Sequence, residues 1–398
     1  MRRIAAGVVS SAPGTIIVTP WYGGTHGGVA VASESLVHGL LAAGGESVAM
    51  LLAPDGWVPR VFYGTAGEEI VEFCVRGRSS AAGTLSQRVG YHLRRNIARE
   101  SLRRLVRGHR IRIVHFVYAI DGYADLALQA HEMGLKVVTT FQGADVNNTL
   151  QNPSTRYMVD DIVAESNHVT VVSRTLYDRL KNAIPSVEPR LTLIHNAVPT
   201  TFAAAAEEMP AIDATTPQWD VLLVGQLIHR KGGDVLLDAL ARVRKRIPTI
   251  RAAFAGSGGF EEELRAQVRR LNLESNVEFV GELSRESLTA AYRSSKLLVI
   301  ASRSEGLPLV LLEALWLGVP VVATAVDGLP EVVVEDVNGL LVPPENAGAL
   351  ADALLRLLLD SDLRRRLGRQ ARASIVDRFS PEATTDKYLE VYRQVLAD

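Results

Sequence analysis

The sequence predicts an α/β protein built from two doubly wound domains that face a central cleft. Short aliphatic runs of the kind that form buried parallel strands alternate with helical patterns through both halves of the chain. Residues 204–218 separate the halves and are rich in alanine, acid, proline and threonine, without an apolar period. We therefore place a first domain at residues 1–203, a linker at 204–218 and a second domain at 219–380. A last helical pattern follows over residues 381–398.

Composition limits the classes of function open to the chain. A net charge of −1 over 398 residues gives no field that would attract nucleic acid, so we expect no nucleic-acid partner. The single cysteine, Cys74, excludes an internal disulfide framework and fits a reducing compartment. No apolar stretch approaches the roughly 20 residues that span a bilayer. We expect a cytoplasmic protein, with the inner face of the membrane as a second expected location if its basic segment binds lipid.

The first domain opens with a strand, a glycine-rich turn and a helix. A strand is predicted at residues 15–19 and a helix at residues 30–42, with Gly27 and Gly28 in the turn between them. This order allows backbone N–H groups to approach an anion at the start of the helix. The alternative is a tight turn in which glycine serves only its dihedral angles.

Residues 85–112 form a strongly basic helical segment with nine arginines and one acid, Glu100. Leu85, Val89, Leu93 and Ile97 recur every fourth residue and form an apolar stripe beside the basic face. Such a helix can dock on anionic lipid headgroups, which would give a peripheral contact with an anionic membrane. We favour the alternative, a solvated helix whose stripe packs on the first sheet. Tyr91 is the one Phe, Trp or Tyr residue among these arginines, and so sparse an aromatic content disfavours nucleic acid.

The strongest candidate site follows a buried strand at residues 296–301. The strand leads into a polar loop with Glu305, Gly306 and Pro308, and then into an apolar helix that carries Glu313. A carboxylate in an apolar helix is costly without a partner, and open α/β sheets bind ligands at the carboxyl ends of their strands. The two acids therefore suit a site for a hydroxyl-rich ligand. The residues alone leave open that Glu305 caps the helix and Glu313 pairs with a core arginine.

A longer pattern around these acids resembles a known family. The spacing Glu305-x7-Glu313 is followed by GVPVVAT at residues 318–324 and GLPEVV at residues 328–333. This order is similar to the donor-site signature of retaining glycosyltransferases of the GT-B fold, family 4. The resemblance implies that Glu305 faces the donor sugar and that Glu313 binds the ribose hydroxyls of the nucleotide. It also implies that helix 381–398 crosses back to complete the first domain.

Further matches extend the implied donor site. Lys231 falls on the family's donor-phosphate lysine, whose charge offsets that of the leaving diphosphate. Gln226 replaces the companion arginine, and Arg230 is a candidate to compensate. The donor side predicted from the resemblance comprises Gly27, Gly28, Gln226, Arg230, Lys231, Gly256, Glu282, Glu305, Gly306, Leu307, Pro308, Leu309 and Glu313.

The acceptor side departs from the family pattern. Many members have His-x-His after the predicted strand at residues 111–117, but here His115 is followed by Val117. We predict three catalytic residues, Lys231, Glu305 and His115. Asp121, in the loop that follows the strand of His115, is a candidate substitute base. The predicted acceptor-side residues are Tyr118, Asp121, Gln142, Asp145 and Asn147.

The reaction implied by the resemblance is sugar transfer with retention at the anomeric carbon, of the hexosyltransferase type. The donor is a nucleoside diphosphate sugar, UDP- or GDP-linked before others, and no cofactor is expected. The acceptor is a sugar, glycolipid or small molecule, in bacterial polysaccharide, glycolipid or other glycoconjugate synthesis. Asp360-Ser361-Asp362 superficially spells a metal-binding Asp-x-Asp, but it lies between two helices. We assign it to a helix cap by Ser361 or Asp362 and expect no essential metal.

Two alternatives remain at this stage. A nucleotide-sugar epimerase also uses two such domains, but the context of Lys231 and Glu305 fits transfer better. A non-catalytic nucleotide-sugar-binding partner subunit is supported only by Val117 and Gln226.

Overall fold

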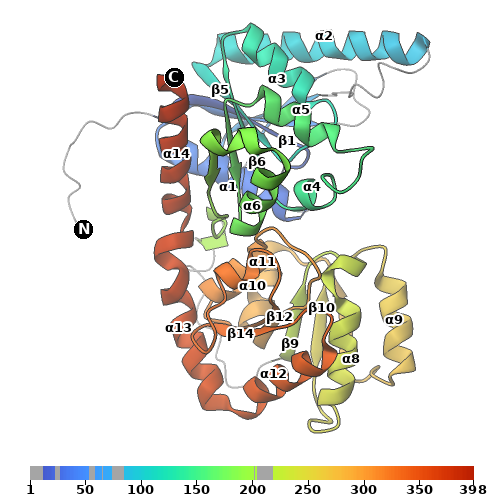
Figure 1. Ribbon diagram of the computed structural model, residues 1–398. Coiled ribbons are helices and arrows are strands. Elements are labelled where there is room, and N and C mark those ends of the chain that lie inside the picture. The colour runs from blue at the N-terminus through green and yellow to red at the C-terminus, as the bar shows by residue number, and fades with distance from the viewer. Residues whose placement is uncertain are drawn as a thin grey trace, which may run out of the picture.

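The computed structural model describes residues 12–22, 27–52, 59–64, 66–73, 85–200, 202–203 and 218–398. These residues form two α/β domains, one above the other in Figure 1, with one parallel sheet at the centre of each. The prediction of two doubly wound domains is confirmed. Cys74 and nearly all of the predicted linker lie outside the described residues.

The first domain is built on an eight-stranded sheet in the order β3-β4-β2-β1-β5-β6-β7-β8. Only the edge strand β3 is antiparallel to its neighbour. Every residue of β1 is buried, as expected for a strand covered by helices on both faces. The strands are β1 Gly14–Thr19, β2 Ser47–Leu52, β3 Arg60–Tyr63, β4 Glu69–Phe73, β5 Ile111–Val117, β6 Lys136–Phe141, β7 His168–Val171 and β8 Leu191–Leu193.

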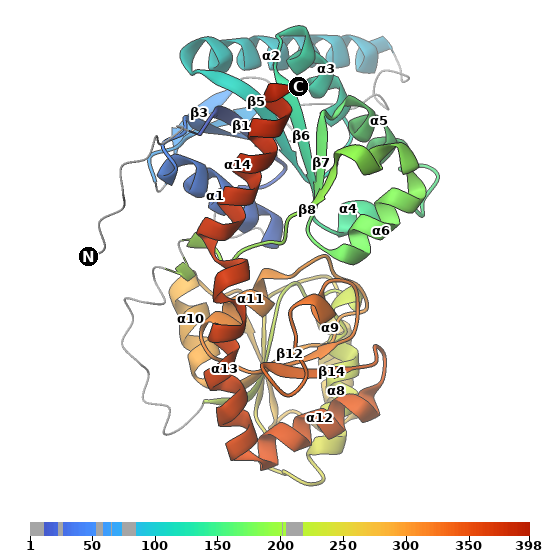
Figure 2. The ribbon, with the colours of Figure 1, turned by 60° about the vertical axis from the view of Figure 1, so that its left-hand side comes forward.

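The helices of the first domain lie on both faces of this sheet and at its outer end (Figures 1 and 2). They are α1 Gly28–Ala42, α2 Leu85–Gly108, α3 Tyr123–Glu132, α4 Ala144–Asn147, α5 Tyr157–Glu165, α6 Arg174–Ala183 and the 3₁₀ turn η2 Pro185–Arg190. Of these helices, α4 and α6 begin at the carboxyl ends of β6 and β7, next to the second domain.

The second domain has a six-stranded, fully parallel sheet in the order β11-β10-β9-β12-β13-β14. The strands are β9 Trp219–Val224, β10 Ala252–Ala255, β11 Val277–Gly281, β12 Ser295–Ile300, β13 Val321–Thr324 and β14 Gly339–Val342. The helices are η3 His229–Lys231, α8 Gly233–Val243, α9 Glu261–Arg270, α10 Arg285–Arg293, α11 Leu309–Trp316, η4 Leu329–Glu331, α12 Ala347–Leu359 and α13 Ser361–Phe379.

The last helix, α14 Pro381–Ala397, returns to the first domain. Ser380 ends α13 in an extended conformation, and its hydroxyl accepts a hydrogen bond from the N–H of Ala383 to cap α14. Tyr388 and Tyr392 are buried in the core that α14 shares with α1 and the first sheet. Both ribbon views show this crossing, which confirms the expected C-terminal helix (Figures 1 and 2).

The structure corrects the predicted cap at the Asp-x-Asp sequence. The side chain of Asp360, not Ser361 or Asp362, accepts the hydrogen bond from the N–H of Leu363, at 2.8 Å. Ser361 is already the first helical residue of α13, so the helix begins two residues before the predicted start at Leu363.

The structure also corrects the packing of α2. Val89 and Leu93 of the predicted stripe are 60% and 48% exposed, whereas Ala98, Leu102 and Leu105 pack in the core of the first domain. The helix lies across the outer end of the domain, on the side away from the second domain (Figures 1 and 2). It packs on the domain through the face that carries Ala98, Leu102 and Leu105 and not through the predicted stripe. Among the described helices, none combines the length and apolarity needed to cross a membrane.

Candidate active site

Glu305 is the centre of a buried ionic cluster in the loop between β12 and α11. Its Oε1 lies 2.6 Å from Nζ of Lys231 and accepts a hydrogen bond from the Ser302 hydroxyl at 2.7 Å. Its Oε2 lies 3.6 Å from Nη1 of Arg230. Burial alone would raise the pKa of Glu305, but the charges of Lys231 and Arg230, with hydrogen bonds from Lys231 and Ser302, lower it below the ordinary value. The carboxylate is therefore ionised at neutral pH although it is buried.

The two cations reach Glu305 because of a close backbone approach at Gly232. Lys231 ends η3, and Gly232 follows it with φ +67°. A Cβ on Gly232 would lie 1.9 Å from the carbonyl oxygen of Ala301, so only glycine allows η3 to sit against the end of β12. Gln226, predicted where the family has an arginine, is exposed, while the guanidinium of Arg230 donates to Ser304 O at 2.8 Å. Arg230 therefore supplies a second positive charge at the cluster.

Glu313 lies on α11, the helix that directly follows the Glu305 loop, and is 7% exposed. Its Oε2 accepts a hydrogen bond from the hydroxyl of Tyr292 on α10, at 2.8 Å. Burial raises the pKa of Glu313 to about 7, against the hydrogen bond from Tyr292 and the charge of Arg285. The partner is a tyrosine rather than the core arginine considered from the sequence. The effect of burial therefore outweighs that of the Tyr292 hydroxyl and of the Arg285 charge.

The remaining donor-side residues occupy turns at the ends of strands. Gly256 has φ +140°, and a Cβ there would lie 2.0 Å from the carbonyl oxygen of Gly225. Glu282 accepts a hydrogen bond from Ser257 at 2.5 Å. Gly27 and Gly28 lie at the exposed start of α1, where residues 23–26 are outside the description. Leu307 and Leu309 are buried, and Pro308 is the N-cap of α11.

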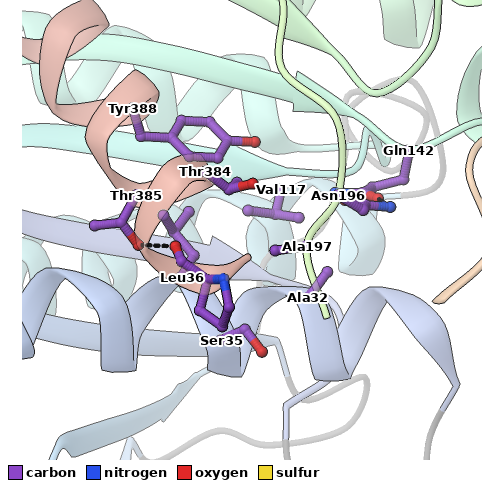
Figure 3. A pocket seen from close by; sticks show the side chains of 11 residues that line it. Ala32, Ser35, Leu36, Val117, Gln142, Asn196, Ala197, Thr384, Thr385 and Tyr388 are labelled. Atoms are coloured by element: carbon purple, nitrogen blue, oxygen red, sulfur yellow. Dashed lines mark hydrogen bonds between the residues drawn. The ribbon is translucent and has the colours of Figure 1, made fainter. Parts of the chain in front are cut away.

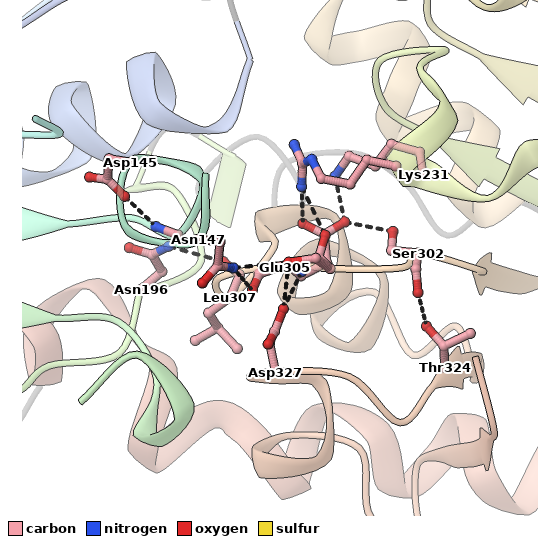
Figure 4. Close-up of polar contacts among 12 residues, drawn as sticks. Asp145, Asn147, Asn196, Lys231, Ser302, Glu305, Leu307, Thr324 and Asp327 are labelled. Atoms are coloured by element: carbon pink, nitrogen blue, oxygen red, sulfur yellow. Dashed lines mark hydrogen bonds and ion pairs between the residues drawn. The ribbon is translucent and has the colours of Figure 1, made fainter. Parts of the chain in front are cut away.

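The first domain contacts the Glu305 loop directly. Asn147 of α4 donates from Nδ2 to Ser304 Oγ at 2.9 Å, and Asn196 donates to the carbonyl oxygen of Leu307 at 3.0 Å. The same amide of Asn196 donates to Gln142 Oε1 at 3.0 Å. Figure 4 shows Asn147 and Asn196 on one side of Glu305 and Lys231 on the other. Gln142 and Asn147 were predicted at this cleft. Asn196, the first residue of the sequence NAVP at residues 196–199, was not predicted as a site residue.

Two other acceptor-side residues shape the backbone of the first domain. The carboxylate of Asp145 is 1% exposed and accepts hydrogen bonds from the N–H groups of Gln142 and Gly143. Burial raises the pKa of Asp145 to about 6, against these hydrogen bonds. Tyr118 follows β5 with φ +79°, an uncommon conformation for a non-glycine residue. Burial raises its pKa to about 12, with Asp145 adding to the shift and Arg230 opposing it.

The structure does not bring His115 or Asp121 to the cluster. His115 is fully buried, with Nδ1 2.7 Å from the hydroxyl of Tyr392 and Nε2 2.6 Å from that of Thr140. Burial lowers its pKa to about 3, so the imidazole is neutral and enclosed beneath α14. This placement contradicts the predicted catalytic role, because the side chain points into the core that α14 completes. Asp121 lines a groove with Tyr157 of α5, a different neighbourhood from that of Glu305.

A small cavity lies beside this interface, between α1 and α14. It has a volume of about 30 Å³, enough for about one water molecule. Val117, Gln142 and Asn196 line one side of it, and Ser35 and Tyr388 line the other (Figure 3). Position 117, where many family members have histidine, therefore faces the same space as the residues that contact the Glu305 loop.

Within the part of the chain that the structure describes, no three histidine, cysteine, aspartate or glutamate side chains gather in a way that could hold a metal ion. The charges at Glu305 are instead balanced by Lys231 and Arg230.

Comparison with known families divides the chain at the same place as the two sheets. Residues 26–202 match the family described as Glycosyltransferase Family 4. Residues 205–374 match the family described as Glycosyl transferases group 1. The two matches follow one another and together span most of the chain.

Relatives with curated names are similar over part of their length. D-inositol 3-phosphate glycosyltransferase of Saccharomonospora viridis is 32% identical over 262 residues, which are 62% of this chain and 60% of that relative. N-acetyl-alpha-D-glucosaminyl L-malate synthase of Bacillus anthracis is 26% identical over 291 residues, 72% of this chain and 75% of that protein.

Solved structures share the fold over almost the whole chain. Sucrose-phosphate synthase from Thermosynechococcus elongatus superposes with a TM-score of 0.73 at 24% identity, over 96% of this chain and 99% of that one. Anabaena HepE, in complex with UDP-glucose, gives a TM-score of 0.70 at 18% identity, over 96% and 99%. At these identities the likeness concerns the fold alone.

Proposed function

The chain belongs to the GT-B glycosyltransferases of family 4, and we propose that it transfers a sugar from a nucleoside diphosphate sugar to an acceptor hydroxyl, with retention at the anomeric carbon. One observation carries the proposal: the buried carboxylate of Glu305 pairs with the partly exposed Lys231 and Arg230 where the second domain meets the first. Retention is supported by the Glu305-x7-Glu313 pattern. Nothing among the similar proteins supports an epimerase or a non-catalytic subunit.

Each charged group has a role that follows from its position. Lys231 and Arg230 would hold the diphosphate and stabilise the charge that develops as it leaves. Glu305, ionised and fixed by Lys231 and Ser302, would accept hydrogen bonds from sugar hydroxyls. Glu313 would accept from the ribose hydroxyls, which are donors that its buried carboxylate can use.

The acceptor proton needs a recipient other than His115. In the proposed step the acceptor oxygen forms a bond to the anomeric carbon while the bond from that carbon to the diphosphate oxygen breaks. The acceptor proton moves to the leaving diphosphate on the same face of the sugar. This route requires no histidine base, in agreement with a neutral His115 enclosed in the core and with Val117 at the next inward position.

We propose that the reaction requires no metal ion, because Lys231 and Arg230 supply two positive charges where the diphosphate would lie. A UDP- or GDP-linked donor is the first choice. The names of the similar enzymes suggest a small polyol phosphate or hydroxy acid as acceptor.

The test is a transfer assay in EDTA with UDP-, GDP- and ADP-sugars, each with D-inositol 3-phosphate, L-malate and simple sugars as acceptors. We expect release of one nucleoside diphosphate that depends on an acceptor, and a product whose anomeric configuration by NMR is that of the donor. An inverted product would contradict retention. Activity that appears only with added magnesium would contradict metal independence, and no transfer in any combination would contradict the function.

We further propose that α2 gives the protein a peripheral contact with anionic membrane at the inner face. Two apolar side chains, Val89 and Leu93, are exposed on a helix in which Arg104 and Arg107 are also exposed. Exposed apolar groups beside arginines suit the boundary between headgroups and acyl chains. The strong positive charge of residues 85–112 opposes pairing of this face with a second copy of itself.

Sedimentation with lipid vesicles tests this contact. We expect binding to vesicles rich in phosphatidylglycerol and none to pure phosphatidylcholine, with binding reduced in Val89→Ser/Leu93→Ser and weakened by salt. Equal substitutions on another exposed apolar pair, Val61→Ser and Phe62→Ser on β3, are the matched control. Unchanged binding in the α2 variant, or no binding by the wild type at low salt, would contradict the contact.

A further inference from the structure

Asp327 joins the two domains at the loop that carries Glu305. It lies in the turn after β13, and its side chain is 4% exposed. Its Oδ2 accepts hydrogen bonds from the N–H of Glu305 at 2.7 Å and from the hydroxyl of Ser304 at 2.8 Å. Its Oδ1 lies 2.8 Å from Nη2 of Arg179 on α6 of the first domain. Figure 4 shows Asp327 beside Glu305. One carboxylate therefore holds both the backbone of Glu305 and a cation of the opposite domain.

These contacts close into a ring across the domain interface. Nη1 of Arg179 donates to Oδ1 of Asn147 at 2.5 Å, and Nδ2 of Asn147 donates to Oγ of Ser304 at 2.9 Å. Ser304 in turn donates to Asp327. The ring contains two residues from each domain. Asp327 and Asn147 contact the backbone of Glu305 directly, and Arg179 contacts both of them. Separation of the domains would break it at two places.

The backbone at this point is held in an uncommon conformation. Asp327 has φ +45°, which costs energy in a residue other than glycine and persists only where the surroundings impose it. The adjacent chains also approach closely: a Cβ on Gly306 would lie 1.8 Å from the carbonyl oxygen of Gln142, and one on Gly328 would lie 2.3 Å from Gly306 O. The Glu305 loop is thus fixed between Asp327 and the first domain when the domains are closed.

We propose that Arg179 and Asp327 are a positioning pair that couples closure of the two domains to the orientation of Glu305. The proposal rests on the proposed function, because it takes Glu305 as the residue that faces the donor sugar. In the closed state Arg179 neutralises Asp327, which then holds the N–H of Glu305. In an open state Asp327 loses this cation and the loop can shift, so the site is complete only after water has been excluded.

Other pairs across the interface do not share this geometry. His195 contacts Glu331 at 2.8 Å and Arg285 contacts Glu34 at 3.4 Å, but neither pair touches the backbone of Glu305. A matched pair exists within the second domain, where Arg356 contacts Asp336 at 2.7 Å. Asp336 also has a positive φ, +58°. This control pair reproduces the arginine, the aspartate and the backbone conformation without the connection between domains.

The test is a double-mutant cycle with Arg179→Ala, Asp327→Asn and their combination. Asn tolerates the left-handed conformation, and Arg179 is a partly exposed side chain, so the variants should fold. We expect each single change to lower kcat of transfer by about tenfold to a hundredfold, because small misplacements of a reacting group have effects of this size. The double variant should be no slower than the slower single variant, because both remove one coupled unit.

Three further readouts separate positioning from simple stabilisation. The dissociation constant of the nucleoside diphosphate should change by less than about twofold, since the donor phosphate site is untouched. The ratio of donor hydrolysis to transfer should rise, because closure no longer coincides with a complete site. Arg179→Lys should recover part of kcat, because it restores the charge but not the two-sided guanidinium contact.

The control variants are Arg356→Ala and Asp336→Asn, which should leave kcat unchanged. If Arg179→Ala and Asp327→Asn also leave kcat and the hydrolysis ratio unchanged, or if their effects multiply independently, the positioning pair is overturned while the proposed function stands. A wild-type protein that transfers no sugar from any donor would overturn the proposed function and this proposal with it.

Discussion

The residues predicted for the donor loop of the second domain lie together in the structure, whereas those predicted at the strand ends of the first domain lie in different places. In the second domain, Lys231, Arg230 and Glu305 were predicted as one site, and their charged groups lie in direct contact. In the first domain, Gln142 and Asn147 reach the interface, but His115 is enclosed in the core and Asp121 lines another groove.

The difference has a physical origin in how each half-site is assembled. The donor loop is a short segment between a strand and a helix, so the relative positions of its residues follow from one stretch of backbone. The same two cations, Lys231 and Arg230, lie opposite it. The acceptor side draws on separate loops at the ends of β5 and β6 and on a helix, α14, that arrives from the end of the chain. On the acceptor side, a residue of the expected type can therefore point into the core although the sequence around it is the same as for a residue that points into the site.

The largest effect is expected at the ionic cluster. Lys231→Met should reduce kcat by about a hundredfold to a thousandfold, because it removes a cation from the diphosphate and leaves Glu305 with Arg230 alone. Glu305→Gln should reduce kcat to a similar extent. The measurement is steady-state transfer under saturating donor.

A matched control for this change is Lys296→Met. Lys296 pairs with Asp220 at 2.6 Å. The two residues lie at the amino ends of β12 and β9, whereas the candidate site lies at the carboxyl ends of the strands. The Lys296→Met variant should retain full kcat. Equal losses of kcat in Lys296→Met and Lys231→Met would mean that the second domain needs its ion pairs for folding. The contrast between the donor loop and the first domain would then disappear.

A second effect concerns stability and pH at Glu313. Its folded-state pKa of about 7 lies above the ordinary value of 4.5, so between these pH values the folded state binds more protons than the unfolded state. The free energy of unfolding should therefore fall as pH rises from about 4.5 to about 7, by on the order of 3 kcal/mol from this group.

Denaturant unfolding of wild type and Glu313→Gln across this pH range measures the contribution of Glu313. The variant, which cannot ionise, should lack this part of the pH dependence, so its stability relative to wild type should increase with pH. A constant difference between the two proteins from pH 5 to pH 8 would contradict the raised pKa.

A smaller effect is expected at His115. His115→Leu should lower the free energy of unfolding by about 1–3 kcal/mol, because it leaves the buried hydroxyl of Tyr392 without its imidazole partner. It should leave kcat per folded molecule unchanged. Thermal unfolding and active-site-normalised kinetics give the two numbers. A large loss of kcat with little loss of stability would return His115 to the catalytic residues and sharpen the account of the first domain.

Sequence reasoning predicted the architecture because buried parallel strands and the loops between them have strong local patterns. It predicted Lys231 and Glu305 because each belongs to one of several separate motifs that occur in the family's order. It did not predict Asn196, Arg179 or Asp327, whose contacts join residues more than a hundred positions apart and whose types are ordinary for exposed turns and helices. Such residues acquire their function from the meeting of the two domains.

The error at α2 has a different cause. Its fourth-residue periodicity correctly indicated a helix, but a helix with two partly apolar faces can pack through either one. The face with Ala98 and Leu102 packs on the domain and leaves Val89 and Leu93 exposed. Periodicity alone cannot decide between such faces, because the decision depends on which parts of the helix lie over the sheet.

The central claim is that the second domain holds a nucleoside diphosphate sugar through Lys231, Glu305 and Glu313 without a metal ion. Its most direct test is thermal unfolding of the wild type and of Glu313→Ala with UDP, GDP and ADP, each with and without attached sugar, in EDTA. The account predicts that one nucleotide stabilises the wild type, by about 2.7 kcal/mol at a hundred times its dissociation constant, and does not stabilise the variant. No stabilisation by any nucleotide, with or without magnesium, or equal stabilisation of the variant, would contradict it.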